Sequence, residues 1–323
     1  MTHNRKRSIP TTKRTGRTKK SGKRQPSSVA SLPYELICSD ALRALQRFSS
    51  NSVAAVITSP PYWSLRSSGI RGEIGSERLL STYLNRLKSI FQELHRVIRN
   101  DGVLWLVIGD AYTSGNRRYR ETDSRHPVRG MSSRPKTPKG LKPKDLIGLP
   151  WRIAFLLQEI GWHLRTEIIW HKPNAMPESV GDRPQRSHEY IFLLSKNSKY
   201  FFDRSVLDTR TSEEVDTQRS IWSVSVGSDG SGHNAVFPAR LITPCLLSST
   251  KRGDIVLDPF AGSGTVGVAC IQNHRRFIGI ELNTSYARLA KERLASMFKK
   301  HQTNGHADKW SKIMRADFIS PVP

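Results

Sequence analysis

An apolar run that stops at two prolines constrains the fold of this 323-residue chain more than any other feature. Residues 53–57 (VAAVI) predict a buried strand, and residues 58–63 (TSPPYW) follow it directly. Each proline fixes its own φ and lacks a backbone donor, so we expect the carbonyls of Ser59 and Pro60 to lie outside any strand ladder. Free acceptors, a hydroxyl group and a flat ring suit a planar ligand with an amino group; a structural Pro-Pro turn is the alternative.

Further apolar runs alternate with amphipathic segments along the chain. We predict strands over residues 34–38, 103–108, 164–170, 191–194, 254–257 and 277–280. We predict helices over residues 79–98, 150–160, 239–248 and 266–273, after a short helical stretch that follows Asp40. Strands that alternate with helices indicate an α/β domain whose sheet is mostly parallel.

Acidic residues stand where three of these strands end, namely Asp40, Asp258 and Glu281. Open α/β sheets bind ligands at the carboxyl ends of their strands, although Asp40 could also cap the following helix. Gly262 and Gly264, in the segment DPFAGSGT, allow the backbone to approach a ligand closely. This turn is too short for a dinucleotide fingerprint and lacks the lysine of a phosphate loop.

The chemistry of these acids predicts a cofactor without phosphate. Asp258 would repel a phosphate group and attract an amino or sulfonium cation, while Glu281 is placed to bind the hydroxyl groups of a ribose. S-adenosyl-L-methionine has a ribose, an amine and a sulfonium group but no phosphate. It is therefore the predicted cofactor.

The net charge of the chain indicates the class of its binding partner. The chain has 52 Lys and Arg against 27 Asp and Glu, a formal net charge of +25, which favours a nucleic acid. Residues 1–34 contain no acid, and we predict a disordered, phosphate-binding basic arm over residues 1–30. We assign residues 31–300 to one domain with a basic inserted loop over 111–145, followed by a polar tail over 301–323.

The sequence favours a reducing compartment and no membrane contact. It contains no secretory signal and no apolar stretch long enough to span a bilayer. Cys38, Cys245 and Cys270 lie far apart in apolar segments, which predicts core residues in a reducing cytosol without a metal site. We expect a cytoplasmic protein.

Two segments resemble motifs of a known family. TSPPYW (58–63) resembles the catalytic motif of amino DNA methyltransferases, and DPFAGSGT (258–265) resembles their cofactor motif. The order, catalytic motif first, resembles the beta class, and the likeness extends over residues 34–294. It implies a Rossmann-like S-adenosylmethionine-dependent methyltransferase fold with permuted motif order and a mixed, mostly parallel sheet of about seven strands.

The resemblance also implies roles for individual residues. Asp258, Gly262 and Gly264 would hold the methionine end of the cofactor, Glu281 its ribose and Asp40 its adenine amino group. The implied cofactor-binding residues are Asp40, Phe237, Asp258, Phe260, Gly262, Gly264, Thr265 and Glu281. The implied catalytic residues are Ser59, Pro60, Pro61 and Tyr62.

The implied reaction is direct methyl transfer to the exocyclic amine of a base flipped out of double-stranded DNA. Serine before Pro-Pro-Tyr is more typical of enzymes that modify the 4-amino group of cytosine, while the 6-amino group of adenine stays open. The family resemblance suggests a restriction-modification system, with an endonuclease as a functional but not a physical partner. The oligomeric state is not predicted.

Several different activities are compatible with the same residues. Methylation of a ring carbon would need a cysteine such as Cys245. An RNA methyltransferase, a protein methyltransferase or an inactive DNA-binding protein could have a similar pocket. His188 and Glu189 could form an acid-base pair, but a structural hydrogen-bonded pair is favoured. DNA recognition is expected in residues 111–145, 174–187 or 203–235; the last segment occupies the usual place of the family's recognition region.

Overall fold

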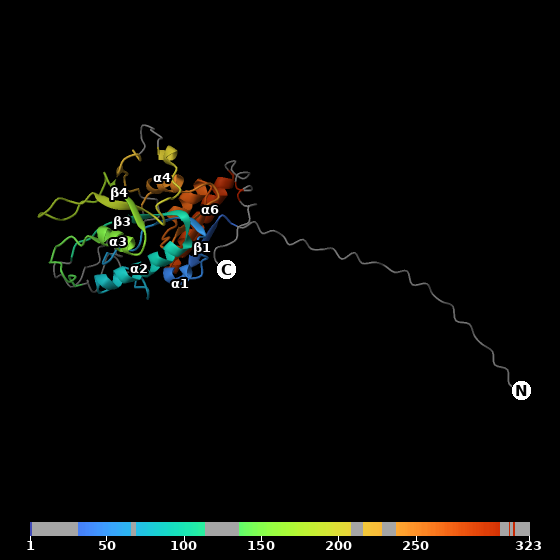
Figure 1. The fold of residues 1–323 in the computed structure, drawn as a ribbon, viewed down its shortest axis with the longest axis horizontal. Helices are drawn as coiled ribbons and strands as arrows, with labels where there is room; N and C mark the ends of the chain where they lie inside the picture. Colours follow the sequence, from blue (N-terminus) through green and yellow to red (C-terminus); the bar gives the residue numbers. More distant parts are fainter. Residues whose placement is uncertain are drawn as a thin grey trace. The chain divides into compact units, whose positions relative to one another are not determined.

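Within the residues that the computed structural model describes, the strands form one eight-stranded sheet (Figure 1). Its order is β1-β8-β7-β2-β3-β5-β4-β6. The strands are β1 (Tyr34–Cys38), β2 (Val53–Thr58), β3 (Ile98–Ile108), β4 (His163–His171), β5 (His188–Ser195), β6 (Ile221–Ser223), β7 (Ile255–Asp258) and β8 (Arg276–Glu281). The central strand β2 is buried along its whole length, as its apolar sequence requires.

The structure describes residues 1, 32–65, 69–113, 136–207, 216–227, 237–303, 310 and 313. The predicted basic arm, apart from its first residue, lies outside them. So do residues 114–135 of the predicted insertion, parts of the 203–235 segment and most of the predicted tail.

One strand runs against its neighbours. β5 pairs antiparallel with both β3 and β4, whereas the other neighbouring pairs in the sheet are parallel. The first residues of β5 therefore lie at the edge where β2, β3 and β4 end. This reversal adds the start of a strand to an edge that otherwise consists of strand ends.

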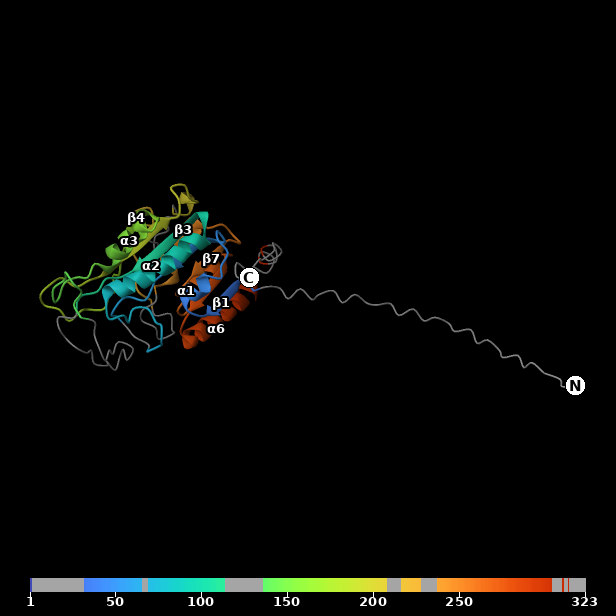
Figure 2. The ribbon, with the colours of Figure 1, turned by 60° about the horizontal axis from the view of Figure 1, so that its bottom comes forward.

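Helices cover both faces of the sheet. One hydrophobic cluster contains residues of α1 (Ala41–Leu45), α2 (Leu80–Val97) and α3 (Leu149–Glu159). The other contains residues of α4 (Ala239–Ser249), α5 (Thr265–Gln272) and α6 (Thr284–His301). A short 3₁₀ helix, η2, spans Arg204–Leu207. Figure 2 shows α2 lying across one face between α1 and α3.

The spacing of apolar residues explains why α2 forms where it does. Its buried residues recur at intervals of three and four, which places them on one face of a helix. They are Leu80, Tyr83, Leu87, Ile90, Phe91, Leu94 and Val97. This face packs against the sheet, and the helix passes directly into β3.

The fold confirms the predicted α/β architecture with a mixed, mostly parallel sheet and departs from the predicted elements in four places. Helix α6 was not predicted. The sheet has an eighth strand, because the three residues of β6 pair with the end of β4. β3 begins at Ile98 rather than 103, since Ile98 pairs with Val53 before a register shift. Trp310, within the predicted polar tail, is buried against Phe298.

Close backbone approach at Gly102 supplies a test of this packing. A Cβ at Gly102 would lie 2.6 Å from the Ala54 carbonyl oxygen, whereas a Cβ at Gly181 meets nothing within 4 Å. We expect Gly102→Ala to lower the free energy of unfolding by about 1–3 kcal/mol through overpacking. Gly181→Ala should change it by less than about 0.5 kcal/mol. Urea unfolding of both variants checks this, and equal stabilities would contradict the packing.

Candidate active site

A cavity of about 590 Å³ follows the carboxyl edge of the sheet. Its volume lies in the range of small-molecule sites, which is about 300–1,000 Å³. Most of the predicted site residues line it: Asp40, Ser59, Pro60, Pro61, Tyr62, Phe237, Phe260, Gly262 and Glu281. The structure thus brings the two motifs, far apart in sequence, to one cavity.

Three predicted cofactor-binding residues lie behind the cavity wall. Asp258 is only 2% exposed and is not among the lining residues. Gly264, with φ of 80°, precedes α5 and packs against Ala290, where its conformation suits glycine. The Thr265 hydroxyl accepts a hydrogen bond from Arg293 at 3.3 Å. In the structure these residues shape the turn, and their direct contact with a cofactor stays a prediction.

The two motifs are joined by one buried hydrogen bond. Thr58, the last residue of β2, donates its hydroxyl to Asp258 Oδ1 at 2.6 Å. The backbone N–H of Phe260 donates to the same oxygen at 3.0 Å. β2 and β7 are neighbours at the point where the chain order of the sheet reverses, the place where open α/β sheets bind ligands.

Burial perturbs both acids of the cofactor motif. Burial raises the pKa of Asp258 to about 7, although the hydrogen bonds from Thr58 and Phe260 oppose the shift. Burial also raises the pKa of Glu281. Glu281 Oε2 accepts from the Gly262 N–H and Oε1 from the Asn283 N–H, both at 2.8 Å. These bonds hold the Glu281 carboxylate at the cavity.

At the β1 end of the edge, Asp40 caps a helix and lines the cavity, while its contact with a cofactor stays a prediction. Its Oδ1 accepts a hydrogen bond from the Arg43 N–H at 3.0 Å and caps α1, while the residue also lines the cavity. Phe260 lines the same cavity. Two carboxyl groups and aromatic surface, without a basic cradle from the glycine turn, suit a nucleoside better than a phosphate ester.

The turn of residues 58–63, the predicted catalytic turn, is held from outside the cavity. The Tyr83 hydroxyl on α2 donates to the Pro61 carbonyl at 2.9 Å, and Trp63 Nε1 donates to the Glu77 carbonyl at 2.8 Å. None of the described residues donates a hydrogen bond to the Pro60 carbonyl. The Pro60 carbonyl oxygen can therefore accept a hydrogen bond from an incoming amino group, as the sequence predicts.

Two further residues line the cavity: Lys172, to which the sequence assigned no role, and Glu189, which it offered only as a possible acid-base partner of His188. The Tyr62 hydroxyl donates to Glu189 Oε2 at 2.8 Å, and Lys172 Nζ donates to Glu189 Oε1. Glu189 is therefore hydrogen-bonded, but its partners among the described residues are Tyr62 and Lys172 and not His188, and it lies in the site. The sequence signals were HKP at 171–173 and HE at 188–189, which the pairing of β4 with β5 makes neighbours.

Other predicted features lie away from this site. Cys245 and Cys270 are buried, but Cys38 is exposed, so its predicted core position is wrong. Among the described residues, no cluster of three or more His, Cys, Asp or Glu is arranged to hold a metal ion. No described helix has the length and apolar character that crossing a membrane requires.

Comparison with known proteins identifies the family. A family model described as DNA methylase, N6_N4_Mtase, matches residues 53–292. The chain belongs to this DNA methylase family. This confirms the predicted resemblance to the beta-class amino methyltransferases.

Individual relatives cover most of this methylase. It is 55% identical over 256 residues to the Type II methyltransferase M.Cfr9I of Citrobacter freundii, covering 79% of this chain and 85% of M.Cfr9I. It is 50% identical over 263 residues to the Type II methyltransferase M.SmaI of Serratia marcescens, covering 80% of this chain and 90% of M.SmaI.

Solved structures agree with the fold. TTHA0409 of Thermus thermophilus, complexed with S-adenosyl-L-methionine, superposes with a TM-score of 0.60 at 28% identity, covering 82% of this chain and 94% of TTHA0409. The PvuII cytosine-N4-specific DNA methyltransferase has a TM-score of 0.62 at 19% identity, covering 88% and 93%, and supports the fold alone.

The raised pKa of Asp258 predicts a pH dependence of stability. Between about pH 4 and 7 the unfolded chain ionises Asp258 while the native protein keeps its proton. The free energy of unfolding should therefore fall by about 1.4 kcal/mol per pH unit across this window and fall no further above it. Urea unfolding of wild type and Asp258→Asn checks this: the variant should lack this component. Equal pH slopes for the two proteins would contradict the raised pKa.

Proposed function

We propose that this methylase transfers a methyl group from S-adenosyl-L-methionine to the 4-amino group of cytosine in double-stranded DNA. Family membership supports the DNA substrate. The observation that carries the choice of cytosine is Ser59 on the cavity wall, where a hydroxyl rather than a carboxylate precedes Pro60. The 6-amino group of adenine is the alternative target.

The cofactor fits the residues at one end of the cavity. We assign Glu281 to the ribose hydroxyl groups, Asp40 to the adenine amino group and Phe237 and Phe260 to apolar contact. Asp258 acts from behind the wall, through its hydrogen bonds to Thr58 and Phe260. When bound, S-adenosylmethionine supplies an electrophilic methyl group, so the protein itself needs no covalent intermediate.

The catalytic turn prepares the amine. The lone pair of an exocyclic amine is delocalised into the ring, which makes it a poor nucleophile. Acceptance of its hydrogens by Ser59 Oγ and the Pro60 carbonyl would shift the nitrogen toward a reactive, tetrahedral form. Positioning and the local field supply the catalysis. Stacking of the flipped base on Tyr62 would offset part of the unstacking energy, a few kcal/mol.

Two of the candidate recognition segments contact each other beside the cavity. Arg183 of the 174–187 segment lies over the ring of Tyr112, with its Cζ 3.8 Å from the ring centroid. Lys144 pairs with Asp182 at 3.0 Å. Met176 and Arg186 of the same segment line the cavity. We propose that these segments together contact DNA around the flipped base.

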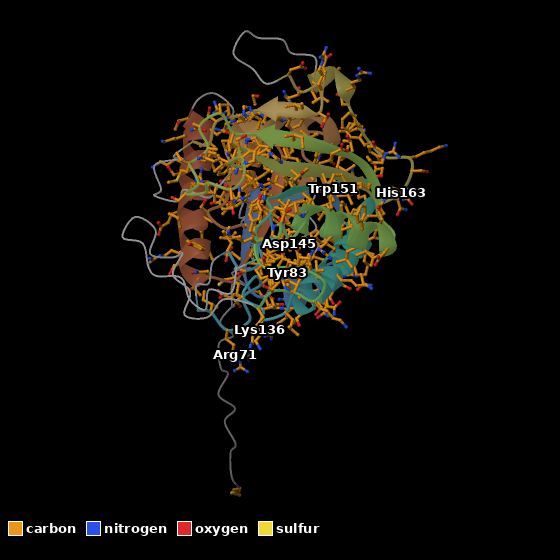
Figure 3. The ribbon with its side chains drawn as sticks, turned by 90° about the vertical axis from the view of Figure 1, so that its left-hand side faces the viewer. Arg71, Tyr83, Lys136, Asp145, Trp151 and His163 are labelled. Atoms are coloured by element: carbon orange, nitrogen blue, oxygen red, sulfur yellow. The ribbon has the colours of Figure 1, made fainter. Side chains whose placement is uncertain are left out.

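Exposed basic residues extend this surface. Figure 3 shows Arg71 and Lys136 projecting away from the sheet at the same end of the view. Arg71 belongs to the loop that follows the catalytic turn, and Lys136 to the described end of the inserted loop. We assign such residues to DNA phosphates, where they add affinity without sequence specificity.

The relatives support a biological setting. M.Cfr9I and M.SmaI are Type II methyltransferases, and we propose that this enzyme likewise belongs to a restriction-modification system. A cognate endonuclease would then recognise the same DNA site as the methylase without binding to the methylase itself. Such an enzyme would act on DNA in the prokaryotic cytoplasm.

Transfer of labelled methyl groups tests the reaction. We expect the protein to label duplex DNA from methyl-labelled S-adenosylmethionine, and nucleoside digestion with mass spectrometry to identify 4-methylcytosine. Ser59→Ala should slow the transfer on the order of 100-fold by misplacing the amine. Recovery of 6-methyladenine would refute the choice of base but not the family. Absence of label from all DNA would redirect attention to RNA, to protein or to an inactive binding protein.

Cys245→Ala distinguishes amine methylation from ring-carbon methylation. Cys245 is 1% exposed, burial raises the pKa of its thiol, and it is not among the residues lining the cavity. We therefore expect the variant to transfer methyl groups at the wild-type rate, measured in the same assay. Loss of transfer by a folded variant, together with 5-methylcytosine as the wild-type product, would show that the thiol is the nucleophile.

A further inference from the structure

Three side chains of the cavity form a hydrogen-bonded chain that ends at a carboxylate. Ser59 Oγ donates to the Tyr62 hydroxyl at 3.5 Å, and the Tyr62 hydroxyl donates to Glu189 Oε2 at 2.8 Å. Both hydroxyl groups thus donate in the same direction, from the catalytic turn toward Glu189. The first bond is long, as catalytic hydrogen bonds often are before substrate binds.

Lys172, the residue directly after β4, completes the arrangement. Its ammonium group pairs with Glu189 Oε1, leaving Oε2 to Tyr62. It also lies 4.2 Å from the centroid of the Trp170 ring. The side chains of Lys172 and Glu189 are 17% and 21% exposed, so the pair is partly shielded but still reaches solvent. A proton delivered to Glu189 can therefore leave the site.

The backbone of β3 fixes the relative positions of Tyr62 and Glu189. A Cβ at Gly109, directly after β3, would lie 2.9 Å from Tyr62 Cε2 and 3.1 Å from Glu189 Cδ. Both side chains therefore pack against this glycine, with no room for another group. Burial and the nearby Glu189 charge also raise the pKa of Tyr62 well above its usual range, which keeps the hydroxyl protonated.

Building on the proposed function, we propose that Glu189 accepts the proton released by the target amine and that Tyr62 relays this proton from Ser59. The amine nitrogen forms its bond to the methyl carbon as the carbon–sulfur bond breaks, and the electron pair of that bond stays on sulfur. The nitrogen is then positively charged and must lose one proton to regain neutrality.

The relay balances this step. The nitrogen gives its proton to Ser59 Oγ, Ser59 gives its own hydroxyl proton to Tyr62, and Tyr62 gives its hydroxyl proton to Glu189 Oε2. Both hydroxyl groups are restored, and the carboxylate becomes a carboxylic acid. The negative charge of Glu189 also stabilises the positive charge that develops on nitrogen during methyl transfer.

A purely structural role for Glu189 makes a different prediction. If Glu189 only holds the Tyr62 ring, glutamine can replace it for that bond, because its amide oxygen still accepts from the Tyr62 hydroxyl while its NH2 group takes the place of Oε1 beside Lys172. If Glu189 receives the proton, glutamine fails, because an amide oxygen is far less basic than a carboxylate. Tyr62→Phe separates the roles from the other side, since it keeps the ring and removes only the hydroxyl.

Single-turnover methyl transfer to DNA measures the difference. We compare wild type, Glu189→Gln, Tyr62→Phe and the double variant, and we measure binding of S-adenosylmethionine and DNA separately. Both single variants should lose at least about 100-fold in rate with unchanged affinities, as expected for general-base catalysis. The double variant should be no slower than either single variant, because both changes interrupt one relay. Glu167→Gln, the same change at an exposed position of β4, should retain the wild-type rate.

Two results would overturn the relay. An active wild type whose Glu189→Gln variant transfers methyl groups equally fast would show that the carboxylate only positions Tyr62. Rate losses that multiply in the double variant would show that the two residues act independently. A wild type that methylates no DNA would overturn the proposed function and the relay together, so the two failures are distinguishable.

Discussion

The site depends on one buried hydrogen bond, from the Thr58 hydroxyl to the Asp258 carboxyl group. It joins the ends of β2 and β7, the strands that deliver the catalytic turn and the glycine turn. A buried polar group left without its partner costs about 1–3 kcal/mol, so the Thr58 hydroxyl requires Asp258, whereas Asp258 has a second donor in the Phe260 N–H. Because this bond lies where the chain order of the sheet reverses, the two motifs that it joins lie beside the same cavity.

The continuity of that cavity is what makes direct transfer feasible. Going along the sheet edge, Asp40 and Glu281 line one end and Ser59 and Tyr62 the region beyond β7. In the proposed reaction, a nucleoside cofactor and a flipped base would therefore meet in one cavity. The antiparallel β5 brings Glu189 to the same edge, where the proposed proton relay ends.

Much of this architecture follows from local sequence patterns. The apolar repeat of α2 and the apolar runs of the strands located most elements to within a few residues, because burial of one face or of both faces imposes those periods. Asp258 and Glu281 were correctly placed at strand ends. β6 was missed because three residues carry no periodic signal, and Trp310 because a lone aromatic in a polar segment does not reveal its packing.

The sequence by itself determined the alternating strands and helices, the proline turn that leaves acceptors free, and the acids at strand ends, since each depends on neighbouring residues. Only the tertiary structure decided which side chains share the cavity. The Asp258 side chain lies behind the cavity wall because it accepts a hydrogen bond there from Thr58, which is 200 residues away in sequence. Glu189 lies in the cavity because its strand runs antiparallel to β3. It accepts a hydrogen bond there from Tyr62, which is 127 residues away in sequence. Strand direction and long-range pairing are set by packing of the whole sheet, which no local pattern encodes.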